Sequence, residues 1–436
     1  MNSIASPRRI DAGLPAVGST RTIAVAIAAA LLTVLLVSFK PYQPFVAPGA
    51  QSGDIVNQVG FATLGAIGLM AILTLADRRT ALSLFGPGWL VMGVFLVLGT
   101  ATAADPGSTM RTLIFTLSAM SGMAAVVALG RDGDAIARVL LVTGTIVVVA
   151  SYAGLVVFPD LARHSSDSLE PQHAGLWRGV FVHKNLTGPV MAAFIFAGVY
   201  MFRRGWRWRG LLLSLSALVF MANTGSKTTL GLVPLVGLAV MVPGIVGLRR
   251  LVPAIFILGM AAGAAATLGI VFVPALKALA GELAPGLTYT GRTQLWSYAG
   301  EMIMHRPWTG YGYEAFWGTP LVTESDRYFD QDWDISNIVH GHNGYLDIAV
   351  TLGVPALVAA GGLFLIGPCR DFLRTPLMRE NVVLADFYMM VVAFSALNAL
   401  LESFFFRRAD PVWLLFFMAV VGLRVTSRRI LPSRSR

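Results

Sequence analysis

The chain has 436 residues, of which 56% are hydrophobic and 13% are charged, and its mean hydropathy is +0.69. A soluble domain carries about 25% charged residues, so this composition excludes a soluble globule and predicts an all-α, polytopic membrane protein. The net charge of +10 reflects membrane topology rather than nucleic-acid binding, because the arginines gather in the loops of one side.

Twelve apolar runs approach the ~20 residues that a helix needs to cross a bilayer. In chain order they lie at about residues 22–39, 59–76, 80–99, 110–130, 135–158, 186–202, 210–223, 228–248, 251–273, 343–367, 382–401 and 411–426. Gly86-Pro87-Gly88 interrupts the third run, which membrane helices tolerate where neighbouring helices satisfy the backbone. The pattern predicts about twelve transmembrane helices. Helices 1–9 occupy residues 22–273 and helices 10–12 occupy residues 342–426, with a large loop at 274–341 between helices 9 and 10. Residues 1–21 and 427–436 form the two tails.

Charge differs between the two sides of this arrangement. With the N-terminus in the cytoplasm, most of the 33 basic residues fall in cytoplasmic loops, as the positive-inside rule requires. We therefore expect both termini in the cytoplasm, and the large loop and all six histidines on the outer side. The first apolar run is as long as a spanning helix and no clear cleavage site follows it, so we expect it to be retained. The single cysteine, Cys369, excludes a disulfide framework.

The large outer loop is rich in aromatic residues and is expected to be structured. Residues 292–304 have a helical period that places Arg292 on one face with Leu295 and Trp296. Arg292 should therefore point toward the membrane domain. Two roles are open for it there: pairing with a carboxylate, or bidentate binding of phosphate oxygens.

Two polar motifs stand at predicted outer helix ends. Ser226 is a candidate N-cap of the eighth helix and Lys227 lies in its first turn, where anions are attracted; a snorkelling lysine is the alternative. His183, Lys184 and Asn185 lead into the sixth helix. They form either an interfacial anchor with an N-cap at Asn185 or part of an anion site.

The strongest functional signal is His342, in the sequence HGHNGYLD at residues 340–347, where the chain enters the tenth predicted helix. An ionisable residue at the membrane boundary is costly to hold there and is a functional candidate by default. A metal site is disfavoured. His340 and His342, at positions i and i+2, do not share a helical face, and no carboxylate or cysteine stands at zinc-like spacing.

Acidic residues near these positions are candidates for support. Asp347, one turn into the tenth helix, is expected to orient the His342 region. Glu402, at the outer end of the eleventh helix, is expected to pair with Arg407 or Arg408.

Six segments of the chain resemble the O-antigen ligase and Wzy-type polymerase superfamily, and among its members the ExoQ-like exopolysaccharide branch. They are residues 179–188 (GVFVHKNLTG), 224–228 (TGSKT), 291–296 (GRTQLW), 306–317 (RPWTGYGYEAFW), 342–346 (HNGYL) and 402–413. The resemblance implies about twelve helices and a large periplasmic loop over a cavity in a bacterial inner membrane. It also implies catalytic roles for His342 and Arg292, with Lys227 where many members have a second arginine.

The resemblance implies an inverting glycosyl transfer at the periplasmic face that uses no metal, nucleotide or other cofactor. The donor is a glycan on undecaprenyl pyrophosphate and the acceptor is another glycan; partners are the lipid bilayer and other exopolysaccharide export machinery, with no nucleic acid. Aromatic and carboxylate side chains of the loop can bind sugars, although a structured loop also needs an aromatic core. The candidate pyrophosphate-binding and substrate-binding residues are His183, Lys184, Asn185, Ser226, Asn343, Tyr345, Tyr311, Glu314 and Trp317.

Three functions compete on this sequence. The first is a polymerase that joins lipid-linked repeat units into exopolysaccharide. The second is a ligase that moves the same kind of donor to another acceptor. The third, of a different class, is a transporter or flippase of lipid-linked oligosaccharide, which predicts ionisable residues near the middle of the membrane, whereas the polar groups here gather at the outer rim.

Overall fold

The computed structural model describes residues 17–44, 54–166, 171–283, 291–324 and 338–432. Within these ranges the regular structure is helical, and the one β-type pairing is an isolated bridge between Arg163 and Trp177. Nine helical segments of the described chain are long and apolar enough to cross a membrane. They are α1 (Val17–Val37), α2 (Ile55–Leu75), α5 (Pro106–Leu129), α6 (Gly133–Val157), α8 (Lys184–Arg203), α10 (Lys227–Ile245), the run of η2 (Arg249–Leu251), α11 (Val252–Ala264), η3 (Ala265–Gly269) and α12 (Ile270–Phe272), the run of α17 (Val354–Gly361), η5 (Gly362–Ile366) and α18 (Gly367–Arg374), and α19 (Arg379–Asn398).

Three further helices coincide with the remaining predicted spans but are shorter. They are α4 (Pro87–Ala101), α9 (Arg207–Ala222) and α20 (Pro411–Thr426). Sixteen residues of α20 rise only about 24 Å, less than the ~30 Å of a hydrocarbon core. The predicted all-α membrane fold is thus confirmed, while the number of spans stays a prediction.

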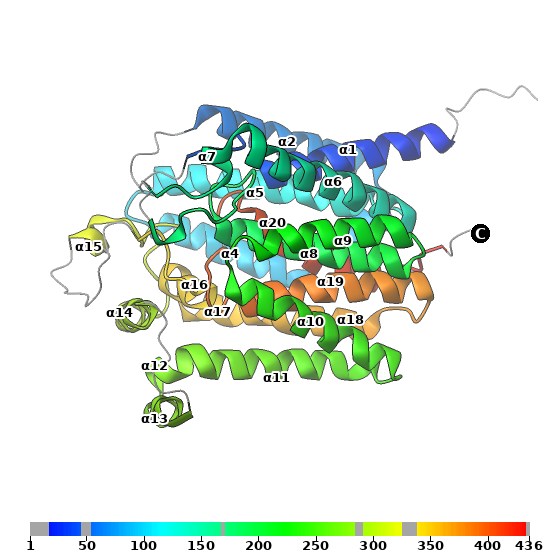
Figure 1. Cartoon of the computed structure of the whole chain (residues 1–436). Helices are drawn as coiled ribbons and strands as arrows, with labels where there is room; N and C mark the ends of the chain where they lie inside the picture. Colours follow the sequence, from blue (N-terminus) through cyan, green and yellow to red (C-terminus); the bar gives the residue numbers. More distant parts are fainter. Residues whose placement is uncertain (1–16, 45–53, 167–170, 284–290, 325–337, 433–436) are drawn as a thin grey trace, which may run out of the picture.

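The long helices lie side by side as a bundle with two distinct ends (Figure 1). At one end, here called the loop end, α13 (Pro274–Leu283) and α14 (Arg292–His305) run across the bundle and are seen end-on, and α15 (Pro320–Thr323) lies beyond them. The short helices α7 (Pro159–Ala162) and η1 (Pro171–His173) precede α8. The predicted large loop therefore contains helices that cover one end of the bundle.

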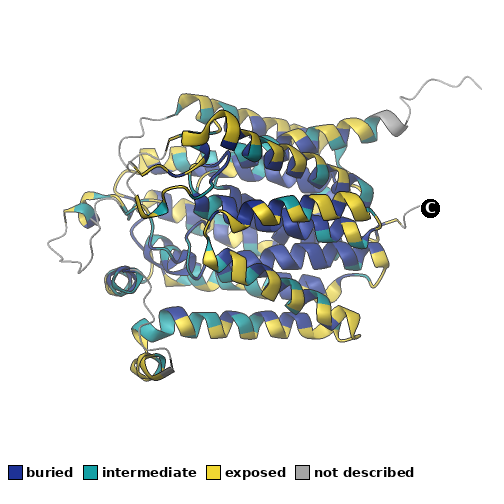
Figure 2. Ribbon diagram, viewed as in Figure 1, coloured by how far each residue is buried: buried dark blue, intermediate teal, exposed yellow. Residues whose placement is uncertain are grey.

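The centre of the bundle is formed by α19 and α20, the last two long helices of the chain. Every residue of α20 is buried, and α19 is buried around most of its circumference (Figure 2). The outer helices instead expose large apolar side chains, such as Leu73 on α2, Val156 on α6 and Leu258 on α11. Exposed apolar surface of this extent is typical of contact with lipid.

Arginines dominate the other end of the bundle, here called the arginine end. Arg204 Nε lies 2.6 Å from Glu380 Oε2, and Arg204 Nη1 lies 3.0 Å from Asp134 Oδ1. Arg249 Nη2 lies 3.1 Å from Asp386 Oδ1. The carboxylates of Glu380 and Asp386 are buried, so these pairs tie α8 and the α10–α11 connection to α19. By the positive-inside rule we expect this end to face the cytoplasm.

The prediction of one tenth helix over residues 343–367 is wrong. The chain forms a short α16 (Gly344–Leu352) at the loop end and then breaks at Gly353, whose φ of +90° and ψ of 166° are accessible essentially to glycine alone. The amides of Tyr311 and Gly312 donate to the carbonyls of Val350 and Thr351 at the end of α16. The break is stable because the outer loop supplies these donors.

The third predicted run, 80–99, also divides. A short α3 (Arg78–Ser83) is followed by the Gly86 interruption, and the apolar helix α4 begins only at Pro87. Proline is favoured at the first position of a helix, where its missing N–H has no role.

Candidate active site

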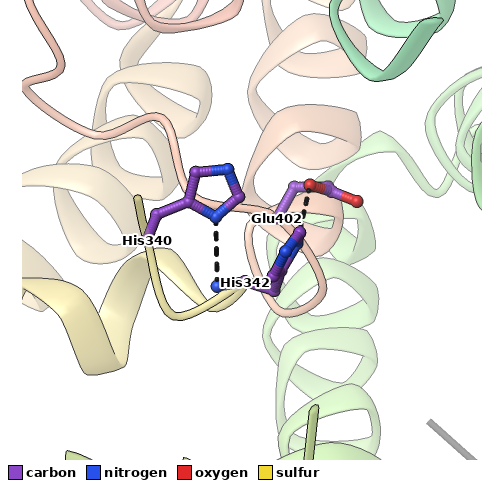
Figure 3. A group of neighbouring side chains, drawn as sticks. All are labelled: His340, His342 and Glu402. Atoms are coloured by element: carbon purple, nitrogen blue, oxygen red, sulfur yellow. Dashed lines mark hydrogen bonds and ion pairs between the residues drawn. The ribbon is translucent and has the colours of Figure 1, made fainter. Parts of the chain in front are cut away.

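Four segments that are distant in sequence meet at the loop end around the carboxylate of Glu402. Arg292 Nη2 lies 3.0 Å from Glu402 Oε1, and the side-chain amide of Asn185 donates to the same oxygen at 3.1 Å. His342 Nδ1 lies 3.4 Å from Glu402 Oε2 (Figure 3). A second guanidinium nitrogen of Arg292 donates to the carbonyl of Leu401 at 2.6 Å. We call Glu402, Arg292, His342 and Asn185 the Glu402 cluster.

Glu402 was expected to pair with Arg407 or Arg408, and this prediction is wrong. Arg407 instead faces Glu314, with 3.7 Å between Nε and Oε1. Burial disfavours the charged form of Glu402, but the hydrogen bond and charge of His342 and the charges of Arg292 and His183 outweigh it and lower its pKa to about 2. Glu402 is therefore an anion throughout the physiological range.

Arg292 begins α14, and the helix holds it in the predicted inward direction. Gly291, with a φ of +78°, turns the chain into the helix. The buried side chains of Leu295 and Trp296 pack with Leu346 of α16 in a small hydrophobic core. Of the two roles open for Arg292 in the sequence, the structure displays the carboxylate pair.

His342 lies in a segment that is fixed from several sides. Trp296 Nε1 donates to the carbonyl of Gly341 at 2.9 Å, and the carboxylate of Asp347 accepts from the amide of Gly341 at 3.1 Å. Asn343 is the N-cap of α16, where its side chain accepts from the amide of Leu346 and donates to the carbonyl of Leu400. Asp347 thus holds the segment that carries His342, as expected.

The backbone at His342 has a φ of +50°, which is uncommon for a residue with a side chain. This conformation brings His340 and His342 together, with ring centroids 4.2 Å apart. The sequence argument that positions i and i+2 cannot share a face assumed a helix, whereas α16 begins only at Gly344. Burial, the neighbouring His342 and two nearby arginines lower the pKa of His340 well below its usual value.

One nitrogen of each of these histidines and one carboxylate oxygen of Glu402 lie within 4.8 Å of one another. Glu402 faces both imidazoles (Figure 3). Nitrogen and oxygen donors of this kind are ligands of zinc and other transition metals. No local pattern indicates this group, because Glu402 lies 60 residues beyond His342.

The motif at residues 183–185 forms the start of α8. The N-cap is His183 rather than the predicted Asn185, because His183 Nδ1 accepts from the amide of Asn185 at 3.1 Å. The amide of Lys184 donates to Nε2 of the buried His164. Asn185 is thereby free of capping and reaches Glu402.

Lys227 begins α10, and Ser226 occupies the predicted N-cap position, although its side chain caps no backbone amide of the helix. The Ser226 side chain pairs with that of Thr229, with 2.8 Å between the hydroxyl oxygens. Lys227 is exposed, and no hydrogen bond or ion pair joins it to the Glu402 cluster in the described chain. The structure therefore brings together His342, Arg292 and Asn185, but not Lys227.

The remaining candidates fall into two groups. Tyr311 and Tyr345 are buried, and their hydroxyls donate to the carbonyls of Met302 and Ala396. Glu314 and Trp317 instead line a cavity of about 70 Å³ beside His340. The cavity also borders Asp347, which accepts a 2.7 Å hydrogen bond from Trp317 Nε1.

Part of the chain matches a model of a known protein family. Residues 211–361, about a third of the chain, match the family model described as O-antigen ligase. The match contains Lys227, Arg292 and His342 and ends before Glu402. No curated protein matches the sequence. The family match confirms the resemblance to the O-antigen ligase and Wzy-type superfamily, and the ExoQ-like branch stays a prediction.

Proposed function

We propose, on the premise that this chain carries an O-antigen ligase domain, that it transfers a lipid-linked glycan to an acceptor hydroxyl at the periplasmic face of a bacterial inner membrane. More specifically, we propose a polymerase that joins undecaprenyl-pyrophosphate-linked repeat units into exopolysaccharide. The observation that carries this proposal is the shared carboxylate. Glu402 holds a candidate general base, His342, beside a candidate phosphate-binding guanidinium, Arg292.

The proposed reaction is a single displacement at carbon 1 of the donor sugar. The acceptor oxygen attacks from the face opposite the carrier, the bond from carbon 1 to the pyrophosphate oxygen breaks, and its electron pair leaves with undecaprenyl pyrophosphate. The proton of the acceptor hydroxyl passes to His342, and the configuration at carbon 1 is inverted. Because Nδ1 of His342 faces Glu402, Nε2 is the nitrogen that takes the proton. Positioned base catalysis of this type contributes about 10²–10⁴ in rate.

Arg292 is suited to the leaving group. Its contacts with Leu401 and Glu402 use two of five guanidinium N–H groups, which leaves the others for pyrophosphate oxygens. Lys227, at the exposed N-terminus of α10, would add a mobile positive charge, and Ser226, His183, Lys184 and Asn185 would complete the anion site. Preorganised charge of this kind is often the largest contribution to catalysis.

Sugar binding would involve the cavity beside His340. Trp317 and Glu314 offer an aromatic surface and a carboxylate there. Tyr311, Tyr345 and Asn343 would act indirectly, because their polar groups already bond to backbone carbonyls. The reaction needs no cofactor or metal, since the energy resides in the activated carrier linkage; the bilayer and export machinery would be the remaining partners.

The test compares wild type with His342→Ala, Arg292→Ala and Lys227→Ala at matched membrane expression, with His305→Ala as the control. His305 is an exposed histidine at the far end of α14. Lipid-linked intermediates and polymer length are measured in cells. A polymerase predicts carrier-linked single repeat units on the periplasmic face and loss of polymer.

Other outcomes would select the competing functions. Carrier-linked polymer of full length would indicate a ligase that lacks only the final transfer. Repeat units retained on the cytoplasmic face would indicate a transporter. Normal polymer from all three variants would contradict the assignment of these residues to the active site.

A further inference from the structure

His340 lines the proposed sugar cavity and moves no proton in the proposed transfer, yet it lies beside both His342 and Glu402. The three side chains place one nitrogen of each histidine and one oxygen of Glu402 within 4.8 Å of one another. Tetrahedral zinc with ligands at 2.0–2.1 Å needs donor atoms about 3.4 Å apart. Side-chain rotations that move these donor atoms by about an ångström would close this difference, and such movements are small for partly exposed side chains.

The orientation of Glu402 favours this arrangement. Its Oε1 already accepts from Arg292 and Asn185, at 3.0 and 3.1 Å. Its Oε2 faces His342. In metal sites the ligating groups are commonly held by such outer contacts, which leave one atom directed at the metal. Arg292 and Asn185 would hold Glu402 in this way.

The segment that carries His340 and His342 is also held in a conformation suited to binding an ion. The amide of His342 donates to Nδ1 of His340 at 3.4 Å, so Nδ1 carries a lone pair, and this long contact is one that an ion can replace. The segment is held by Asp347 and Trp296 through Gly341. A His₂Glu set with an open fourth position is a recurrent zinc-binding arrangement.

The positively charged guanidinium of Arg292 lies next to the same carboxylate, so its repulsion would weaken the binding of a metal ion there. This charge distinguishes the group from a structural zinc site. The geometry points to a reversible site for a divalent transition-metal ion such as Zn²⁺, formed by His340, His342 and Glu402, at which the ion inhibits glycan transfer. Binding is independent of the proposed function, whereas inhibition rests on it, because a metal-bound His342 cannot accept the proton of the acceptor hydroxyl.

Binding is tested directly with Co²⁺ and the full-length protein in lipid nanodiscs, purified without a polyhistidine tag. Tetrahedral Co²⁺ gives a visible absorption band that reports its ligands without any activity assay. We expect one saturable Co²⁺ site per chain that Zn²⁺ displaces. His340→Ala should weaken binding by about 100-fold or more, since loss of even an outer contact costs 10–100-fold. His305→Ala should bind as wild type does.

Inhibition is measured separately by titrating Zn²⁺ into the transfer assay. Inhibition is expressed relative to each variant's own metal-free rate, and on that scale His340→Ala should require at least about 10-fold more Zn²⁺ for half inhibition than wild type. No saturable Co²⁺ band, or an unchanged band in His340→Ala, would overturn the metal site. Loss of the band in His173→Ala instead would assign the metal to the histidines near α8 and would also overturn it. A Co²⁺ site in a protein without transferase activity would sustain the metal site and reject the proposed function.

Discussion

Replacing Glu402 with alanine is expected to lower kcat by about 10–100-fold and to leave KM nearly unchanged, because Glu402 positions His342 and Arg292 and touches no substrate. A 100-fold loss corresponds to about 2.7 kcal/mol of transition-state stabilisation. Glu402→Gln keeps the shape and one acceptor oxygen, so it should recover part of the activity. Both variants are assayed with purified protein and a lipid-linked donor.

The effect on folding can be worked out from the contacts. The bonds from Arg292 and Asn185, at 3.0 and 3.1 Å, involve a charged acceptor, and each such bond contributes about 1.5–3 kcal/mol. Arg292 is 23% exposed and can be rehydrated, so Glu402→Ala should lower the free energy of unfolding by about 2–3 kcal/mol. The lowered pKa of Glu402 means that this stabilisation is present above the unfolded value of 4.5 and is lost as the pH falls toward about 2.

The control is Glu282→Ala, which removes an exposed carboxylate from α13. It should change neither kcat nor the unfolding temperature. Wild-type kcat in Glu402→Ala would refute the reasoning. So would a loss of kcat that follows the fraction of unfolded protein, or a Glu402→Gln variant no more active than the alanine.

Three further predictions concern stability and are measured by thermal unfolding in detergent. Gly353→Ala should cost about 3 kcal/mol or more, because the backbone there strains any other residue and a Cβ would lie 2.4 Å from the carbonyl oxygen of Trp308; Gly361→Ala, with no atom within 4 Å of the added Cβ, should cost nothing. Arg204→Ala should cost about 3–5 kcal/mol by leaving Glu380 buried without its partner, whereas a double replacement by methionine should cost far less; equal losses would contradict this account. Burial raises the pKa of Asp410 from 3.8 to about 6. The folded state then keeps a proton that the unfolded chain loses, so stability should fall by up to about 3 kcal/mol as the pH rises from about 4 to 6. Asp410→Asn, which retains the N-cap of α20, should remove that slope, and an unchanged slope would show that another group titrates.

The helices and the direction of Arg292 could be predicted from the sequence, because both depend on residues that are close together in the chain. Hydropathy located the apolar helices, and the helical period placed Arg292 on the buried face of α14. These predictions succeed because a helix satisfies its own backbone and only its face must match the surroundings.

The errors arise where a distant segment decides the structure. Gly353 breaks a helix because the loop at Tyr311 and Gly312 supplies hydrogen bonds to the exposed carbonyls, and hydropathy contains no trace of that contact. Glu402 was assigned to nearby arginines, whereas its partner Arg292 lies 110 residues away. His342 was treated as helical, and its positive φ was not evident from sequence.

The position of α19 and α20 at the centre of the bundle has a consequence for biogenesis. These helices leave the ribosome after the other long helices of the described chain, so each earlier helix that packs around them must wait for them to complete its buried face. The connection between them also delivers Glu402, so the histidine and arginine cannot be fixed in place before the C-terminal hairpin has inserted. A nascent chain would therefore pass through the membrane insertion machinery as a loosely assembled and inactive bundle. The Glu402 cluster would be assembled only when α20 enters the membrane.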